Sequence, residues 1–94
     1  MTTENLYTRQ PEQIVMYLTT WCSDCRRARS FLERNNILFI AVDVEKDAQA
    51  EAFVKEINSG NRSVPTIIFP DGSVLVEPST EELNEKFADG ARRT

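Results

Sequence analysis

The chain has two cysteines, Cys22 and Cys25, and they lie close together in the sequence Trp21-Cys22-Ser23-Asp24-Cys25. A cysteine thiolate attacks disulfides, and side chains three residues apart share a helix face, within reach of a disulfide bond. The pair follows an apolar segment typical of a strand and enters a segment typical of a helix. This position favours a redox-active dithiol.

The two thiols are expected to differ in role. Cys22 lies at the amino end of the predicted helix, where unpaired backbone N–H groups and the positive end of the helix dipole favour a thiolate. Cys25 lies one turn further along, on the predicted apolar stripe. We therefore predict Cys22 as the nucleophile and Cys25 as the resolving thiol. Arg26 and Arg27 add to the positive field and Asp24 opposes it, and the sequence leaves that balance open.

Three other uses of the cysteines were considered. A zinc site needs about four ligands, and the chain offers two cysteines and no histidine, so only a carboxylate-assisted or intersubunit site remains. A structural disulfide closing a four-residue loop would stabilise the fold by only about 2 kcal/mol in the chain-entropy model. Two unrelated buried thiols could lie anywhere in the chain, so their shared position at a strand-to-helix junction argues against chance placement. We predict no metal site.

Length and composition exclude several classes of function. The 94 residues form one small domain, and a hydrophobic content of 40% is enough for a single core. The formal net charge of −4 disfavours nucleic acid as a partner, since phosphate backbones would repel it. No apolar run approaches the roughly 18 residues of a spanning helix, and the polar start lacks a signal-peptide core. We expect a cytoplasmic protein with no membrane partner.

The segments around the dithiol predict a parallel crossover unit. Residues 14–19 are a continuous run of strand-forming side chains, as in a strand covered on both faces. Residues 26–35 have helical spacing, and residues 38–42 repeat the buried-strand pattern. A strand, a helix and a strand in this order are typical of a βαβ unit. The helix is expected to bury one stripe, made of Cys25, Ala28 and Leu32 with Phe31 beside them.

The second half of the chain predicts a helix, a hairpin and a closing helix. Residues 47–60 begin at a capping Asp47 and end at Gly60, with one apolar face made of Ala50, Phe53, Val54 and Ile57. Residues 66–69 and 73–76 flank the turn Pro70-Asp71-Gly72, which forces antiparallel pairing. Ser79 and Glu82 form a capping box. The fold class is therefore α/β, in the order β-α-β-α-β-β-α, a four-stranded mixed sheet flanked by three helices.

Three ranges describe the domain organisation. Residues 1–13 read as a polar N-terminal arm, residues 14–89 as the domain, and residues 90–94 as a C-terminal tail.

A second group of residues precedes the third strand. Pro65 stands at the first position of that strand, where a missing N–H is tolerated. Together with the dithiol, the stretch Ser63-Val64-Pro65-Thr66 and the pair Asp71-Gly72 make the chain resemble a glutaredoxin of the thioredoxin superfamily over roughly residues 14–88. The stretches 61–66 and 69–73 most resemble the mycoredoxin branch, which uses mycothiol where others use glutathione.

The resemblance implies a thioredoxin-like fold, thiol-disulfide oxidoreductase activity and a set of site residues. It gives Cys22 as nucleophile, Cys25 as resolving cysteine and Pro65 as a cis-proline beside them. It also implies a substrate-binding rim, in which the Val64 backbone pairs with the peptide-like part of the substrate thiol and further contacts come from Trp21, Arg62, Ser79 and Thr80. Trp21 is equally consistent with a packing role, and Arg62 with a solvated surface charge.

Two positions depart from the common glutaredoxin pattern. Asp24 stands where an aromatic residue is usual, and Thr19 stands where a lysine is usual. Both changes remove features expected around the carboxylates of glutathione. They favour a neutral, sugar-bearing thiol or a protein substrate.

The expected function is reduction of disulfides, or of protein mixed disulfides, with a low-molecular-weight thiol, in cell redox homeostasis. Mycothiol or glutathione would be the thiol co-substrate, with no tightly bound cofactor, and we expect a monomer. Two alternatives remain open. One is a redoxin recycled directly by a thioredoxin-reductase-type flavoprotein. The other is a non-enzymatic module in which Cys22 from two chains and two external thiols hold an iron-sulfur cluster.

Overall fold

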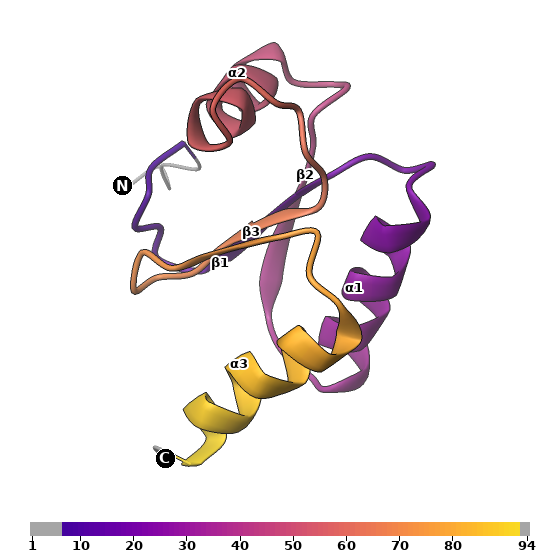
Figure 1. The fold of residues 1–94 in the computed structure, drawn as a ribbon, viewed down its shortest axis with the longest axis vertical. Coiled ribbons are helices and arrows are strands. Elements are labelled where there is room, and N and C mark those ends of the chain that lie inside the picture. The colour runs from indigo at the N-terminus through magenta and orange to yellow at the C-terminus, as the bar shows by residue number, and fades with distance from the viewer. Residues whose placement is uncertain (1–6, 93–94) are drawn as a thin grey trace, which may run out of the picture.

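The computed structural model describes residues 7–92, which form one mixed sheet and three helices (Figure 1). The order of the elements is the one that the sequence predicts. They are β1 (Ile14–Leu18), α1 (Ser23–Arg34), β2 (Phe39–Asp43), α2 (Ala48–Ile57), β3 (Thr66–Ile68), β4 (Val74–Val76) and α3 (Thr80–Arg92).

The sheet has the strand order β2-β1-β3-β4, so β1 is an interior strand. It pairs in parallel with β2 and antiparallel with β3, and β3 pairs antiparallel with β4. Both the parallel crossover and the hairpin are therefore confirmed. Since α1 begins five residues after β1 ends, the dithiol leaves the sheet from the carboxyl end of an interior strand.

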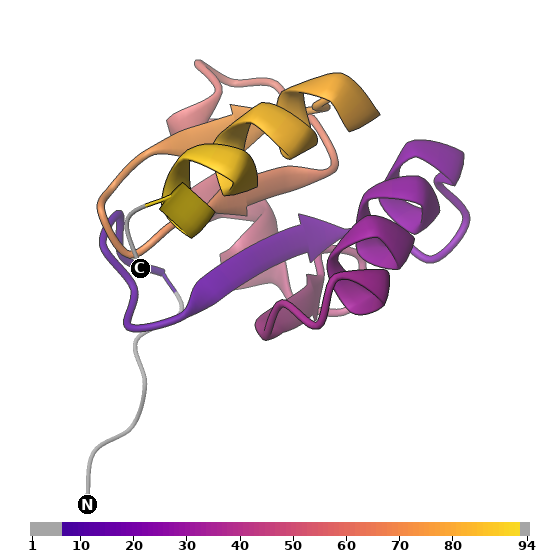
Figure 2. The same ribbon diagram turned by 90° about the horizontal axis from the view of Figure 1, so that it is seen from below.

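Helices cover both faces of the sheet (Figures 1 and 2). Side chains alternate along β1, so Met16 and Leu18 pack with α1 and α3, whereas Val15 and Tyr17 pack with α2. The first of these two cores also contains Cys25. The resolving thiol predicted from the sequence is thus part of the layer between the sheet, α1 and α3.

Helix α1 buries the stripe that its apolar spacing predicts, namely Cys25, Ala28, Phe31 and Leu32. It begins three residues earlier than the predicted range. The reason is that Cys22 acts as the N-cap, with its sulfur accepting the backbone N–H of Cys25. At the other end, Asn35 is the C-cap and Asn36 adopts a positive φ of 57°, so the helix ends within one residue of the predicted range.

The predicted caps of the other two helices are also present. Asp47 caps α2 by accepting the backbone N–H groups of Gln49 and Ala50. Before α3, Ser79 Oγ accepts a hydrogen bond from the N–H of Glu82, and the Glu82 carboxylate accepts one from the N–H of Ser79. Of the helices within residues 7–92, none is long and apolar enough to cross a membrane.

The burial predicted for the second strand is wrong. Leu38 precedes β2 and is 83% exposed, and Ala41 within the strand is also exposed. The sheet order explains the difference, because β2 lies at the edge and pairs only with β1. An apolar run therefore predicted the strand correctly but not its position in the sheet.

Part of the predicted N-terminal arm packs against the domain. The Tyr7 hydroxyl donates a hydrogen bond of 2.5 Å to Asp47, and its ring meets that of Phe53 edge-on at 6.3 Å. Pro11 is buried. The first six residues of the arm, and residues 93–94 of the predicted tail, lie outside the described residues, while α3 continues to Arg92. The boundaries at residues 14 and 89 stay predictions.

Candidate active site

The dithiol has one accessible and one buried sulfur. Cys22 is half-buried at the N-cap of α1, whereas Cys25 is only 1% exposed. Both cysteines are free, and the Cys22 sulfur accepts a hydrogen bond of 3.2 Å from the backbone N–H of Cys25. This bond holds the Cys22 sulfur against the first turn of α1. The two thiols are adjacent but differ in their surroundings.

The pKa of the Cys25 thiol is strongly displaced. Burial raises it to about 12, the Cys22 sulfur acts in the same direction, and contacts with Thr19 oppose them. The desolvation effect is the largest because Cys25 is packed among the apolar side chains of the core. Cys25 is therefore protonated in the resting dithiol at neutral pH.

The proline loop lies beside Cys22. The Val64–Pro65 peptide bond is cis, as the resemblance implies, and the Cys22 thiol donates to the Val64 carbonyl oxygen at 3.9 Å. The Thr66 hydroxyl braces the loop by donating to the Ser63 carbonyl at 2.7 Å. On the far side, the Glu77 N–H donates to the Pro65 carbonyl at 2.8 Å. The loop is thereby held between the dithiol and the segment that leads into α3.

Asp24, which departs from the common pattern, is paired with an arginine of its own helix. Its carboxylate lies 3.0 Å from Nη1 of Arg27, and Nη2 of Arg27 donates to the Pro78 carbonyl oxygen at 3.3 Å. Arg27 therefore offsets the charge of Asp24 and also connects the start of α1 to the segment before α3. Both charges are apparent in the sequence, but the ion pair between them is seen only in the structure.

Trp21 is 61% exposed next to the nucleophilic position, so it is not a core residue. Its indole N–H donates a hydrogen bond of 2.8 Å to the carboxylate of Glu45. Glu45 is not among the residues predicted from the sequence. A signal was available, because β1 and β2 are parallel and the residues just after their carboxyl ends meet at the same edge of the sheet.

Two of the remaining predicted rim residues have partners of their own. Arg62 lies 3.4 Å from the carboxylate of Glu51, and Ser79 is engaged in the capping box of α3. Thr80 is exposed at the first position of α3. The structure thus brings Cys22, Cys25 and Val64 into contact. Arg62 and Ser79 are instead bonded to Glu51 and Glu82.

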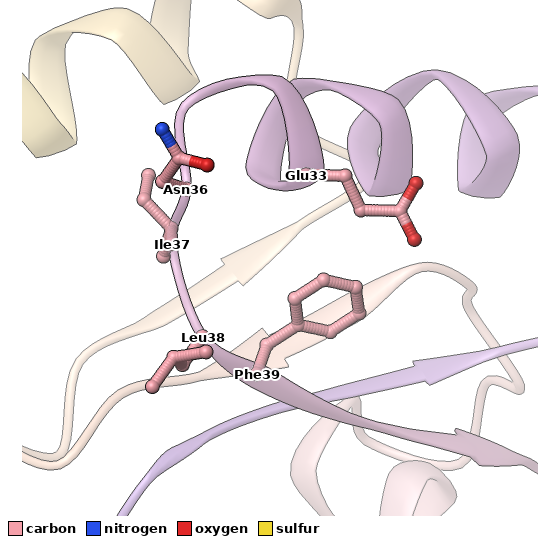
Figure 3. A pocket seen from close by; sticks show the side chains of 5 residues that line it. All are labelled: Glu33, Asn36, Ile37, Leu38 and Phe39. Carbon is pink, nitrogen blue, oxygen red and sulfur yellow. The ribbon is translucent and has the colours of Figure 1, made fainter.

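A separate hollow of about 340 Å³ lies at the other end of the sheet, lined by Glu33, Asn36, Ile37, Leu38 and Phe39 (Figure 3). It adjoins the amino end of β2, whereas the dithiol follows the carboxyl end of β1. Since the two strands are parallel, the hollow and the dithiol lie at opposite ends of these strands. The hollow is not part of the dithiol site.

Within residues 7–92, no group of three or more histidine, cysteine, aspartate or glutamate side chains could hold a metal ion.

Comparison with solved structures gives the class of protein. The thioredoxin-like protein BC3987 superposes with a TM-score of 0.68 and 30% identity, over 78% of this chain and 97% of that one. The glutaredoxin grx-1 from Archaeoglobus fulgidus gives a TM-score of 0.67 and 26% identity, over 90% of this chain and 96% of that one. The four-stranded sheet with its dithiol at the start of α1 is thus a thioredoxin-type fold.

The family follows from the sequence comparisons. The glutaredoxin family model matches residues 14–75, and the chain belongs to the glutaredoxin family. A Mycobacterium tuberculosis protein that carries a glutaredoxin name is 42% identical over 74 residues, which are 79% of this chain and 88% of that protein. Mycoredoxin 1 of Corynebacterium glutamicum is 34% identical over 74 residues, or 79% and 91% of the two chains. Members of this family are generally thiol-disulfide oxidoreductases.

Proposed function

We propose that this protein reduces protein disulfides and mixed disulfides in the cytoplasm, with Cys22 as the nucleophile, Cys25 as the resolving thiol and a low-molecular-weight thiol as the reductant. One observation carries the proposal. The two sulfurs are adjacent, yet Cys22 is accessible at a helix start and Cys25 is buried with a pKa raised to about 12. An incoming disulfide can therefore reach only the first of them.

The chemistry has two steps. The Cys22 thiolate attacks one sulfur of the substrate disulfide, breaks its S–S bond, releases one thiolate and forms a mixed disulfide. In the dithiol route Cys25 then attacks Cys22, releases the second thiol and leaves the Cys22–Cys25 disulfide. In the monothiol route an external thiol attacks the sulfur bound to Cys22, forms a new disulfide with it and releases Cys22 as the thiolate. A reduction potential of about −200 to −230 mV, the range of glutaredoxins, is expected.

The rim around Cys22 favours mycothiol over glutathione as the external thiol. Glutathione carries two carboxylates, which need cationic partners, whereas mycothiol is a neutral sugar-bearing thiol. Two arginines of this region are already paired, Arg27 with Asp24 and Arg62 with Glu51. Thr19 is buried where a lysine is usual. The similarity to mycoredoxin 1 of Corynebacterium glutamicum supports the same choice.

The substrate would lie along the proline loop. We assign the Val64 backbone to pairing with its peptide-like part, with Pro65 shaping the loop and Trp21 covering one side. Arg62, Ser79 and Thr80 would make outer contacts, for which Arg62 would first have to release Glu51.

A second candidate is recycling by a thioredoxin-reductase-type flavoprotein. The observation that favours it is the 30% identity to a thioredoxin-like protein of the same fold, together with Asp24 in place of an aromatic residue. In that case the Cys22–Cys25 disulfide would be the substrate of the reductase, and small thiols would not be required.

The test compares three reductants on one mixed-disulfide substrate. Turnover is measured with mycothiol, with glutathione, and with NADPH and a thioredoxin reductase, for the wild type and for Cys25→Ser. We expect turnover with mycothiol to exceed that with glutathione by about tenfold or more, and Cys25→Ser to retain it. The monothiol route needs only Cys22, so Cys25→Ser serves as its internal control.

Two outcomes would contradict the proposal. Turnover only with the flavoprotein, and its complete loss in Cys25→Ser, would establish the second candidate. A coloured protein that contains iron after anaerobic purification and elutes as a dimer would instead favour the iron-sulfur module. Faster turnover with glutathione would overturn the choice of thiol alone.

A further inference from the structure

The hydroxyl of Thr19 is an exception among the buried polar groups. Thr19 follows β1 directly and is 1% exposed, and its Oγ1 has no hydrogen-bond partner among the residues that the structure describes. The other buried polar side chain of the described core is Thr66, whose hydroxyl bonds both Ser63 and Asn58. Buried polar groups are nearly always paired, and an unpaired one is unfavourable. A valine at residue 19 would have almost the same shape without this penalty, so packing alone does not account for the hydroxyl.

The group next to Thr19 is the resolving thiol. Contacts with Thr19, from both its backbone and its side chain, lower the pKa of Cys25 against the larger opposing effect of burial. The remaining core around Cys25 is apolar and includes Met16, Leu18 and Leu32. Thr19, Cys22 and Cys25 therefore form a small polar cluster at the edge of this core.

The chemistry of the second step provides a partner for the hydroxyl. Cys25 is protonated at rest, but it must carry negative charge on its sulfur when it attacks the Cys22 sulfur. In apolar surroundings that charge is unfavourable unless a donor faces it. The Thr19 hydroxyl makes no well-formed hydrogen bond in the resting dithiol, but it lies close enough to lower the pKa of Cys25. It can therefore turn toward the sulfur as the charge develops.

We propose that the Thr19 hydroxyl donates a hydrogen bond to the Cys25 sulfur during the resolving step and so accelerates closure of the Cys22–Cys25 disulfide. This inference rests on the proposed function. The reaction converts the mixed disulfide of Cys22 and the Cys25 thiol into the Cys22–Cys25 disulfide and a free substrate thiol. The bond between Cys22 and the substrate breaks, the Cys22–Cys25 bond forms, and the proton of Cys25 passes to the leaving thiolate. Thr19 keeps its own proton throughout.

The experiment separates the two chemical steps in a single turnover. Reduced protein is mixed with a fluorescent peptide disulfide, quenched with acid at successive times, and analysed by mass spectrometry for the mixed disulfide and the closed disulfide. For Thr19→Val we expect attack by Cys22 within twofold of the wild type and closure by Cys25 slowed about tenfold, the effect of one ordinary hydrogen bond. The mixed disulfide should therefore accumulate.

Four further variants make the result specific. Thr19→Ser keeps the hydroxyl and should restore closure, whereas Thr20→Val changes the exposed neighbouring threonine and should match the wild type. In the Cys25→Ser background, where an external thiol resolves the intermediate, the tenfold penalty of Thr19→Val should be absent. Thr19→Ala is a second hydroxyl-free variant if Thr19→Val does not fold.

Several results would overturn the inference. Closure at the wild-type rate in Thr19→Val, an equal slowing of the attack by Cys22, a penalty that persists in the Cys25→Ser background, or failure of Thr19→Ser to rescue would each do so. The proposed function itself would fail differently, because the wild type would then form no mixed disulfide at all.

Discussion

The surface around Cys22 and the core beneath Cys25 are two different environments within one four-residue motif. Around Cys22 lie an exposed tryptophan, a proline loop and charged side chains that are already paired. Cys25 shares its core with the fully buried Leu32 and Leu83, and the polar Thr19 also lies close to it. The motif is symmetric in sequence, but its two sulfurs differ in exposure and in the pKa that burial raises for Cys25.

The difference arises from simple geometry. The first cysteine is the N-cap, where the chain has not yet entered the helix, and the second is one turn inside it on the buried stripe. A helix that packs one face on a sheet buries its apolar stripe. Here Cys25 lies on that stripe and the N-cap Cys22 lies outside it. Side chains on the surface around Cys22 can therefore rearrange when a substrate binds. Those in the core around Cys25 are held in place by packing.

The largest expected effect distinguishes the two cysteines directly. Cys22→Ser should lose at least about 1000-fold in activity with every reductant, because the other thiol, Cys25, is buried and cannot replace it as the nucleophile. Cys25→Ser should lose the dithiol route and keep the monothiol route. Steady-state assays with a protein disulfide and with a small mixed disulfide measure the two routes. Equal losses for both variants would show that the sulfurs are not functionally divided.

The second prediction concerns stability beneath Cys25. Leu83 of α3 is fully buried in the same core, so Leu83→Ala should lower the free energy of unfolding by about 2–5 kcal/mol. Val76→Ala is the matched control in β4, and since Val76 is 41% exposed it should cost less than about 1 kcal/mol. Urea denaturation of the reduced proteins measures both. Similar losses at the two positions would remove the distinction between core and surface.

The third prediction follows from the raised pKa of Cys25. In the unfolded chain the thiol ionises near its ordinary value of 9.0, and in the folded protein near 12. Between these values the unfolded state loses the proton first, so folding stability is full below pH 9 and falls as the pH rises toward 12. The slope should reach up to about 1.4 kcal/mol per pH unit.

The matched comparison for this effect is Cys25→Ala. Tyr17, whose pKa is also raised by burial, is present in both proteins, so its contribution cancels. Denaturant unfolding from pH 8 to 11 under reducing conditions should show a steeper decline for the wild type than for Cys25→Ala. Parallel curves would mean that the folded state does not hold this thiol protonated.

The fold was predictable wherever a local pattern determines it. The buried stripe of α1, the Asp47 cap and the Ser79–Glu82 capping box each depend on residues within one or two turns, and all are present. The exposure of Leu38 was not predictable in this way. It depends on β2 lying at the edge of the sheet, which is a property of the strand order.

The same distinction between local patterns and tertiary contacts applies to the candidate site. The spacing of Cys22 and Cys25 and their unequal burial follow from one helix. The bond from Trp21 to Glu45, the pairing of Arg27 with Pro78 and the unpartnered hydroxyl of Thr19 depend on segments that only the fold brings together. Sequence patterns identify the reacting groups, whereas their tuning depends on tertiary contacts.

The smallest expected effect is at the surface beside Cys22. Trp21→Ala should change the free energy of unfolding by less than about 0.5 kcal/mol, since the side chain is mostly exposed. It should lower kcat/KM for a peptide disulfide about three- to tenfold, the contribution of one exposed aromatic contact. A small symmetric disulfide, which cannot reach the indole, should react at nearly the wild-type rate.

Glu45→Gln is the control that separates contact from orientation. The glutamine keeps an oxygen that can accept the indole N–H, and it removes only the charge. If Trp21 acts by covering the substrate, Glu45→Gln should stay within about twofold of the wild type with both substrates, because the ring is still held. The contrary result is that Trp21→Ala destabilises the protein, or slows the reaction of the small disulfide as much as that of the peptide. Either result would show that the indole supports the packing of the site. The surface around Cys22 would then depend on the core more than its exposure suggests.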